Sequence, residues 1–165
     1  MAEPTGATVP GPREVFARMQ QGWLGHAPNV FLDDGLADDV VIETPFAPPG
    51  RLRRFQGREE FVAFAKAGRA ALPVRFEECR NVTIHETTDP EVIVVEYELV
   101  GTVTTMDHRA AAAFIGVLRV RNGQIVQWRE YQNVLTMAQA LGQLPALLAS
   151  IPAGHPESAS SPAGA

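Results

Sequence analysis

The sequence predicts an α+β domain in which helices pack on one face of a curved, antiparallel or mixed β-sheet. Three observations support this fold class. Apolar residues recur at helical spacing in the first part of the chain, and the spacing changes to two after Pro73. Four strand-like segments then follow one another, with turn sequences such as Asn122-Gly123 between them. Helices followed by an antiparallel meander are typical of α+β proteins.

The first helix is expected to begin at Pro12, because proline is tolerated in the first turn of a helix. Phe16, Met19 and Trp23 follow at helical spacing, and Gly25 ends the pattern. These residues predict one amphipathic helix at the start of the domain.

A second, shorter helix is predicted from Pro28 towards Leu36, with Asp38 and Asp39 ending it. The segment 40–44, rich in β-branched residues, is expected to form a strand. The Pro and Gly residues that follow predict a loop.

A third helix is predicted to start after Gly57, since Glu59 and Glu60 suit its positive N-terminal end and Arg69 its last turn. One apolar stripe is expected to face the sheet. It consists of Phe61, Phe64, Ala65 and Gly68.

The alternating segments predict four long strands, at 74–86, 92–104, 109–121 and 124–131. The segment 135–148 is expected to form a C-terminal helix or turn.

The chain has 165 residues, of which 45% are hydrophobic, as expected for one globular domain. We predict that this domain spans residues 12–150 and that the Pro-, Gly- and Ser-rich segments 1–11 and 151–165 are disordered tails. No apolar run is long enough to span a membrane and no signal peptide is evident, so a cytoplasmic protein is expected. The formal charge of -5 argues against nucleic acid as a partner.

The sequence offers little for metals or cofactors. Its four histidines lie far apart with no carboxylate at ligand spacing, and Cys79 is the single cysteine. No phosphate-binding loop or dinucleotide fingerprint is present. We therefore expect neither a metal nor a cofactor.

Strand alternation separates an inner face from an outer face. On the second long strand, Tyr97 shares its face with the apolar residues Ile93, Val95, Leu99 and Val103. The third long strand is apolar on both faces, which is typical of a strand that is covered twice. A homodimer through the outer sheet face is therefore expected.

Glu130 is the main candidate for chemistry. Alternation places it on one face of the last strand with Val126 and Trp128, where an apolar surrounding would raise the pKa of its carboxyl group. Such a group can take up and return a proton near neutral pH. The alternative is that Glu130 forms an ion pair with Arg119 or Arg129 on a solvated face, and alternation by itself favours this simpler interpretation.

The run RVRNGQIVQWREYQN, together with FIGVL, LADDVVIETPFAPPG and QGREEF, resembles the SnoaL-like branch of the superfamily of nuclear transport factor 2 and ketosteroid isomerase. The resemblance covers residues 12–145. It implies a cone-shaped α+β barrel, in which a curved sheet wraps around three N-terminal helices and encloses an apolar pocket. Dimers through the sheet face are common in this superfamily.

Two groups are most similar. The phenazine-biosynthesis A/B proteins share the pattern IHETTDPEVIVVEY and a final segment similar to WREYQNVLTMAQALG; the resemblance implies that Glu130 is a proton donor or acceptor in the pocket. The limonene-type epoxide hydrolases are similar over GVLRVRNGQIVQWREYQN. Their arginine and second aspartate fall on Tyr97 and Leu99, and their water-holding pair falls on Ile42 and Thr44, so most of their water-activating network is missing.

The resemblance favours a pocket position for Glu130. It makes Tyr97 the second catalytic candidate, because the Tyr97 hydroxyl could orient a ligand or Glu130. The alternative is that Tyr97 is a tyrosine of the core. The acidic oxyanion donor of ketosteroid isomerase falls on Gly116, and its general base falls on Thr44. The expected substrate-binding residues are Trp23, Phe46, Phe61, Phe64, Phe114, Gly116 and Trp128.

These residues lead to a first hypothesis, a cofactor-independent isomerase, cyclase or dehydratase for a small apolar or aromatic oxygenated substrate, such as a polyketide intermediate. A second hypothesis is a non-catalytic binding or accessory module, and a third is an epoxide hydrolase.

Overall fold

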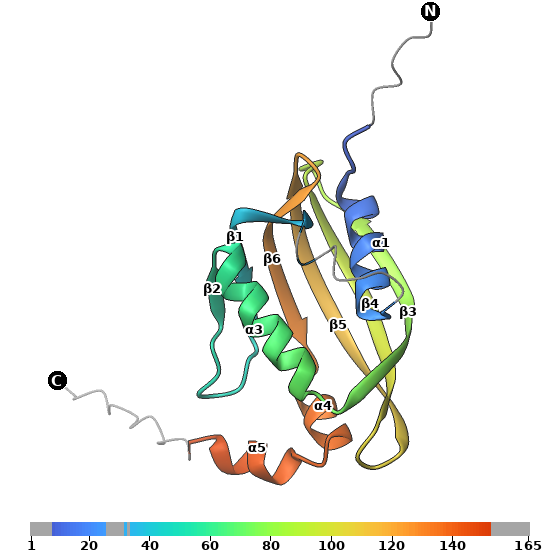
Figure 1. Ribbon diagram of the computed structural model, residues 1–165, viewed down its shortest axis with the longest axis vertical. Helices are drawn as coiled ribbons and strands as arrows, with labels where there is room; N and C mark the ends of the chain where they lie inside the picture. The colour runs from blue at the N-terminus through green and yellow to red at the C-terminus, as the bar shows by residue number, and fades with distance from the viewer. Residues whose placement is uncertain (1–7, 26–31, 33, 153–165) are drawn as a thin grey trace, which may run out of the picture.

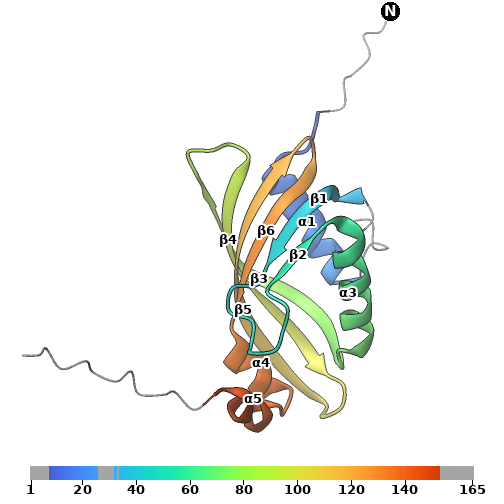
Figure 2. The same cartoon turned by 90° about the vertical axis from the view of Figure 1, so that its left-hand side faces the viewer.

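In the described part of the chain, a twisted six-stranded sheet carries two helices on one face and two short helices at one end. The computed structural model describes residues 8–25, 32 and 34–152. Figure 1 shows α1 and α3 in front of the sheet and α4 and α5 at the end away from the N-terminus. Turning the molecule by 90° places α1 and α3 on the same side of the curved sheet (Figure 2). The predicted α+β class is confirmed.

The helices on the sheet start where the sequence predicts. Helix α1 (Pro12–Trp23) has proline in its first turn and buries Val15, Phe16 and Met19. Helix α3 (Arg58–Ala71) has two glutamates in its first turn and buries Phe61. Its predicted stripe is buried only in part, because the side chain of Phe64 is 49% exposed.

The sheet has the order β2-β1-β6-β5-β4-β3 and is open at both edges. All neighbouring strands are antiparallel except β1 and β6, which are parallel. The strands are β1 (Leu36–Glu43), β2 (Arg54–Gln56), β3 (Val74–Glu86), β4 (Val92–Val103), β5 (His108–Arg121) and β6 (Gln124–Gln132).

The four long strands agree with the predicted segments to within one residue at each end. Alternation and turn residues together define the ends of these strands, because each strand pairs with the next one along the sequence. Asn122 has φ 52° and Gly123 has φ 77°, as a tight hairpin between two twisted strands requires. At the C-terminus, the predicted single segment is divided into α4 (Val134–Ala140) and α5 (Leu144–Ser150).

The structure corrects the prediction for the segment before this sheet. β1 begins at Leu36, so Asp38 and Asp39 lie within a strand instead of ending a helix. Most of the predicted second helix lies outside the described residues. The sequence also gave no sign of β2, whose three residues pair with β1.

A second correction concerns β6. The pairing of β5 with β6 shifts register between Arg119 and Val120, which leaves Val126 without a partner in the ladder. Ile125, not Val126, is fully buried. Trp128 and Glu130 nevertheless keep the predicted inner face, because the bulge precedes them.

The core lies between the inner face of the sheet and the two helices, and it includes Phe16, Met19, Leu36, Ile42, Tyr97, Leu118 and Ile125. In the described part of the chain, no helix is long and apolar enough to cross a membrane.

Candidate functional site

Glu130 lies on the inner face of β6 and accepts two hydrogen bonds. The Tyr97 hydroxyl on β4 donates to its Oε2 at 2.7 Å, and the Gln132 amide donates to its Oε1 at 2.6 Å. Gln132 is two residues further along the same strand and therefore shares the face of Glu130. Glu130 pairs with Gly116 on β5, the strand between β4 and β6. The two catalytic candidates named by the sequence are thus in direct contact.

Burial controls the electrostatics of this pair. Glu130 is 9% exposed, and desolvation raises the pKa of its carboxyl group, although the hydrogen bonds from Gln132 and Tyr97 lower it in part. Burial, followed by the nearby charge of Glu130, raises the pKa of the Tyr97 hydroxyl well above its usual value. Tyr97 therefore stays protonated near neutral pH and acts as a hydrogen-bond donor.

The arginines considered as partners of Glu130 bind other carboxylates. Arg129 lies on the opposite face of β6 and contacts Glu43 at 2.7 Å. Arg119 contacts Asp89 at 2.8 Å and Glu91 at 3.2 Å. Among the described residues, the hydrogen bonds to the Glu130 carboxylate come from neutral groups, so its charge is not balanced by a salt bridge.

The ring of Tyr97 is held between two other aromatic rings. Trp23 stacks on it with centroids 5.1 Å apart and planes 19° apart, and Phe114 stacks on it at 5.3 Å and 11°. Both ring faces are therefore covered, and a ligand can reach Tyr97 only at its edge. This stack fixes the direction of the hydroxyl towards Glu130.

The remaining inner residues surround the same point. Trp128 has its ring 6.4 Å from that of Trp23 and 6.0 Å from that of Phe61. A Cβ atom at Gly116 would lie 3.7 Å from Trp128 Nε1 and 3.8 Å from Tyr97 Cε1. Because Gly116 has no side chain, a space about the size of a methyl group remains between the rings of Trp128 and Tyr97.

Two predicted pocket residues lie elsewhere. Phe64 packs on Phe55 with centroids 4.5 Å apart and remains half exposed. Phe46 is 63% exposed and packs edge-on against Tyr131 at 5.1 Å. The structure therefore brings five of the seven predicted substrate-binding residues together near Glu130, but not these two.

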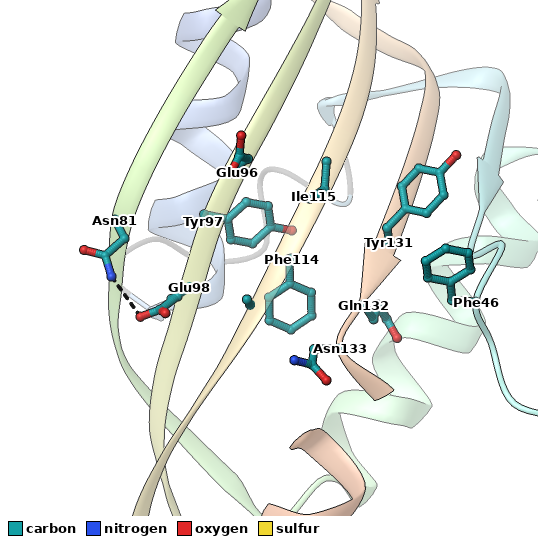
Figure 3. Close-up of a pocket in the computed structure, with 11 residues that line it drawn as sticks. Phe46, Asn81, Glu96, Tyr97, Glu98, Phe114, Ile115, Tyr131, Gln132 and Asn133 are labelled. Carbon is teal, nitrogen blue, oxygen red and sulfur yellow. Dashed lines mark hydrogen bonds between the residues drawn. The ribbon is translucent and has the colours of Figure 1, made fainter. Parts of the chain in front are cut away.

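Phe46 and Tyr131 instead line a groove of about 390 Å³, which we call the outer groove. Figure 3 shows this groove with Phe46 beside Tyr131 at one side and the bonded pair Asn81 and Glu98 at the other. Its other lining residues come from β4, β5, β6 and the N-cap of α4. They include exposed residues of the outer face such as Ile115, and also Tyr97, Phe114 and Gln132.

Gln132 is the residue of the site that sequence reasoning missed. Its signal was available, since a side chain two positions after Glu130 on a strand lies on the same face. The predicted strand ended at Tyr131, one residue too early.

No group of three His, Cys, Asp or Glu side chains that could hold a metal ion occurs within the described ranges. What the arrangement offers is one buried carboxylate with two neutral hydrogen-bond donors, a set suited to moving a proton.

Replacing Tyr97 by Phe tests the link between the two groups. We expect the pKa of Glu130 to rise further, because the carboxylate loses a hydrogen bond that favours its charged form. The pKa can be followed by NMR titration of the labelled carboxyl carbon. Tyr131→Phe, at the other tyrosine of the chain, is the matched control and should leave this pKa unchanged. An equal pKa in Tyr97→Phe and wild type would contradict the assigned role.

The comparisons with known proteins agree with this fold. A family model described as the SnoaL-like domain matches residues 5–128. The match ends two residues before Glu130, so the case for that residue is geometric. An uncharacterized PhzA/B-like protein of Pseudomonas aeruginosa is 39% identical over 102 residues, which are 62% of this chain and 70% of that protein.

Solved structures show the same architecture. A candidate isomerase from Bacillus subtilis has a TM-score of 0.72 at 21% identity, covering 79% of this chain and 92% of the other. A candidate polyketide cyclase from Pseudomonas putida has a TM-score of 0.62 at 15% identity, covering 79% and 98%. An LEH-like epoxide hydrolase from M. tuberculosis has a TM-score of 0.52 at 22% identity, covering 82% and 92%. These matches confirm the fold.

Proposed function

This chain belongs to the SnoaL-like family, and on that premise we propose that it is a cofactor-independent enzyme of the isomerase or cyclase type. Its substrate is a small, largely apolar molecule that carries oxygen, such as a polyketide or aromatic intermediate. Glu130 moves a proton between two atoms of this substrate. One observation supports the proposal most directly, the buried Glu130 carboxyl group with its raised pKa and its two neutral hydrogen-bond donors.

The proposed chemistry needs a group that takes a proton from one atom of the substrate and later gives it to another. Ionised Glu130 takes a proton from a carbon next to a substrate carbonyl group, and the electron pair of that C–H bond moves into the carbonyl system. The protonated carboxyl group then gives the same proton to another substrate atom. The proton count is balanced within the cycle.

The residues around Glu130 have separate roles in this scheme. Tyr97 is a positioning residue, because the rings of Trp23 and Phe114 stack on its ring and its hydroxyl points at Glu130. Gln132 holds the second carboxylate oxygen. Trp128 and Phe61 form an apolar wall that keeps water from the carboxylate, which maintains its basicity.

The test compares cell extracts incubated with wild type and with Glu130→Gln. Mass spectrometry should find one metabolite that is consumed, with an isomeric or dehydrated product, only with wild type. Glu86→Gln is the matched control, since Glu86 lies at the end of β3 and pairs with Arg13 outside this site. A metabolite that binds both proteins and is recovered unchanged would favour the non-catalytic binding module instead.

The outer groove supports a second proposal, that two copies of the chain form a homodimer through the outer sheet face. Ile115 is 43% exposed in the middle of β5 and lines the same groove as the exposed ring of Phe46. A second copy placed on this face would remove both side chains from water.

Ile115→Arg should therefore shift the protein from dimer to monomer in sedimentation or light-scattering measurements, because it places a charge in the proposed interface. Ile151→Arg is the matched control, at an isoleucine that is 50% exposed beyond α5. A monomeric wild type, or a dimer that Ile115→Arg leaves intact, would reject this interface.

A further inference from the structure

Large apolar side chains are exposed together at one end of the molecule. Of those that are exposed in the described part of the chain, half lie in the loop between β1 and β2, in the β4–β5 hairpin, or in and just after α4 and α5. We call them the end patch; they are between 45% and 62% exposed and comprise Leu52, Met106, Leu135, Leu148 and Ile151. In Figures 1 and 2 the hairpin, α4 and α5 lie at the end opposite the N-terminus, and the loop reaches towards the same end. Exposed apolar side chains that gather in one place mark an interaction surface.

Two contacts join the three segments. A Cβ atom at Gly142, between α4 and α5, would lie 3.7 Å from Met106 Sδ in the hairpin. Phe46 of the loop lines the outer groove together with Asn133, the N-cap of α4. The end patch is therefore one surface that is built from three parts of the chain.

Helix α5 lacks a cover in this structure. Its sequence, LPALLAS, is apolar all round except for its last residue, yet none of its residues is buried. A helix that is apolar on every side is normally covered by other protein or by lipid. The sequence also has no charged side chain from Tyr131 to Pro152, although 20% of all residues in the chain are charged. The surface that α5 leaves exposed therefore suits an apolar partner.

Arginines adjoin this apolar surface. Arg51 and Arg53 stand on either side of Leu52, both are exposed, and neither has an ion-pair partner within the described ranges. The next residue, Arg54, differs from them because it contacts Glu43 at 3.2 Å. Two cationic groups beside the end patch are thus available to an anionic partner.

The charge balance of this end differs from that of the whole molecule. The segments 44–53, 104–107 and 134–152 contain two arginines and one carboxylate, Asp107. Their charge is therefore positive, whereas the formal charge of the whole chain is -5. An anionic surface would attract this end of the molecule and repel the rest.

An anionic lipid surface fits these features better than a second copy of the chain. A twofold contact through the end patch would set Arg51 and Arg53 of both copies in one interface, where like charges oppose binding. Anionic headgroups instead attract each arginine. A lipid surface also accepts protruding side chains without a matching groove, and the outer groove includes no residue of the end patch.

We propose that the end patch docks the protein on anionic lipid membranes. The apolar side chains of the patch enter the boundary between headgroups and acyl chains, while Arg51 and Arg53 bind headgroup phosphates. This is contact with the membrane surface and not a span, because α4 and α5 have seven residues each. The proposal does not depend on the chemistry proposed for Glu130.

Sedimentation of the full-length protein with vesicles tests the proposal. Vesicles of phosphatidylcholine and phosphatidylglycerol in equal parts should carry the protein down, and added salt should release it, because salt screens the arginines. Vesicles of phosphatidylcholine alone should carry down much less. Absence of the protein from both pellets, or equal amounts in both, would overturn the proposal.

A matched pair of charge variants locates the contact. Arg51→Gln should weaken binding to the mixed vesicles about fivefold, the contribution of one arginine near an anionic surface. Arg18→Gln removes the same charge from α1, where Arg18 is also exposed and has no ion-pair partner among the described residues, and it should bind as wild type does. Equal losses in the two variants would show that overall charge, and not the end patch, controls binding, and would refute the docking surface.

A second pair tests the apolar part of the contact. Ile151→Asn should weaken vesicle binding at least about fourfold, the effect of withdrawing one methylene group from hydrocarbon. Val9→Asn is its control, at a valine that is 62% exposed before α1, and it should have no effect. Equal near-UV circular dichroism shows that each variant is folded. If the protein self-associates without lipid and Ile151→Asn abolishes this, the patch binds a second copy and the lipid proposal is wrong.

Glu130→Gln keeps this test separate from the test of catalysis. The variant should bind vesicles as wild type does, because residue 130 is buried and lies outside the end patch. Vesicle binding that is lost in Glu130→Gln but kept in Ile151→Asn would reject the end patch as the docking surface.

Discussion

Glu130→Gln should slow turnover of the substrate by roughly two to four orders of magnitude, the usual contribution of a positioned acid or base. The substitution keeps the size of the side chain and its hydrogen bonds. Tyr97 can still donate to the new carbonyl oxygen, and the Gln132 amide can rotate to accept from the new NH2 group. What is lost is the ability to hold a proton, so KM should change little while kcat falls.

The same variant has a stability signature that needs no substrate. The pKa of Glu130 is raised in the folded protein, from a reference value of 4.5, because of burial. The folded state thus holds a proton that the unfolded state has lost, and the wild type loses stability as pH rises from 4.5 through the raised pKa, then levels off. Glu130→Gln lacks this loss. Urea unfolding at several pH values should therefore show a difference in unfolding free energy that increasingly favours the variant as pH rises. A constant difference would mean that Glu130 titrates alike in both states.

The sequence predicted the sheet best where local rules determine it. Strands β3 to β6 pair in sequence order, so alternation and turns such as Asn122-Gly123 define their ends. β2 escaped prediction because three residues give no period, and because its pairing is with β1, which lies before it across a loop. Asp38 and Asp39 have low strand propensity and lie in the irregular part of the ladder between Leu36 and Val41, whose own pairs with β6 hold both ends of this segment.

The site could be predicted in its chemistry but not in its contacts. Alternation placed Tyr97 and Glu130 on inner faces, whereas their hydrogen bond spans 33 positions in the sequence and depends on the curvature of the sheet. The stack of Trp23, Tyr97 and Phe114 depends equally on where α1 lies. Phe46 and Phe64 looked like pocket residues because an aromatic side chain carries no sign of its direction within a loop or on a partly exposed helix.

Gly101→Ala should destabilise the protein by about 1–3 kcal/mol, the usual effect of overpacking a core. A Cβ atom there would lie 2.6 Å from the carbonyl oxygen of Arg75 and 2.9 Å from Val74 Cγ1. The oxygen belongs to the backbone of β3, which pairs with β4 at this point and cannot move without disturbing the ladder. The strain must therefore be taken up by the sheet itself.

Gly116→Ala is the matched control on the neighbouring strand. Its Cβ would meet nothing closer than 3.6 Å, at Leu118 Cδ1, which is ordinary van der Waals contact. Because alanine also reduces the freedom of the unfolded chain, this change should be neutral or stabilising by up to about 1 kcal/mol. Urea unfolding of both variants measures the contrast. Equal stabilities would mean that the close approach of β3 to Gly101 relaxes at little cost.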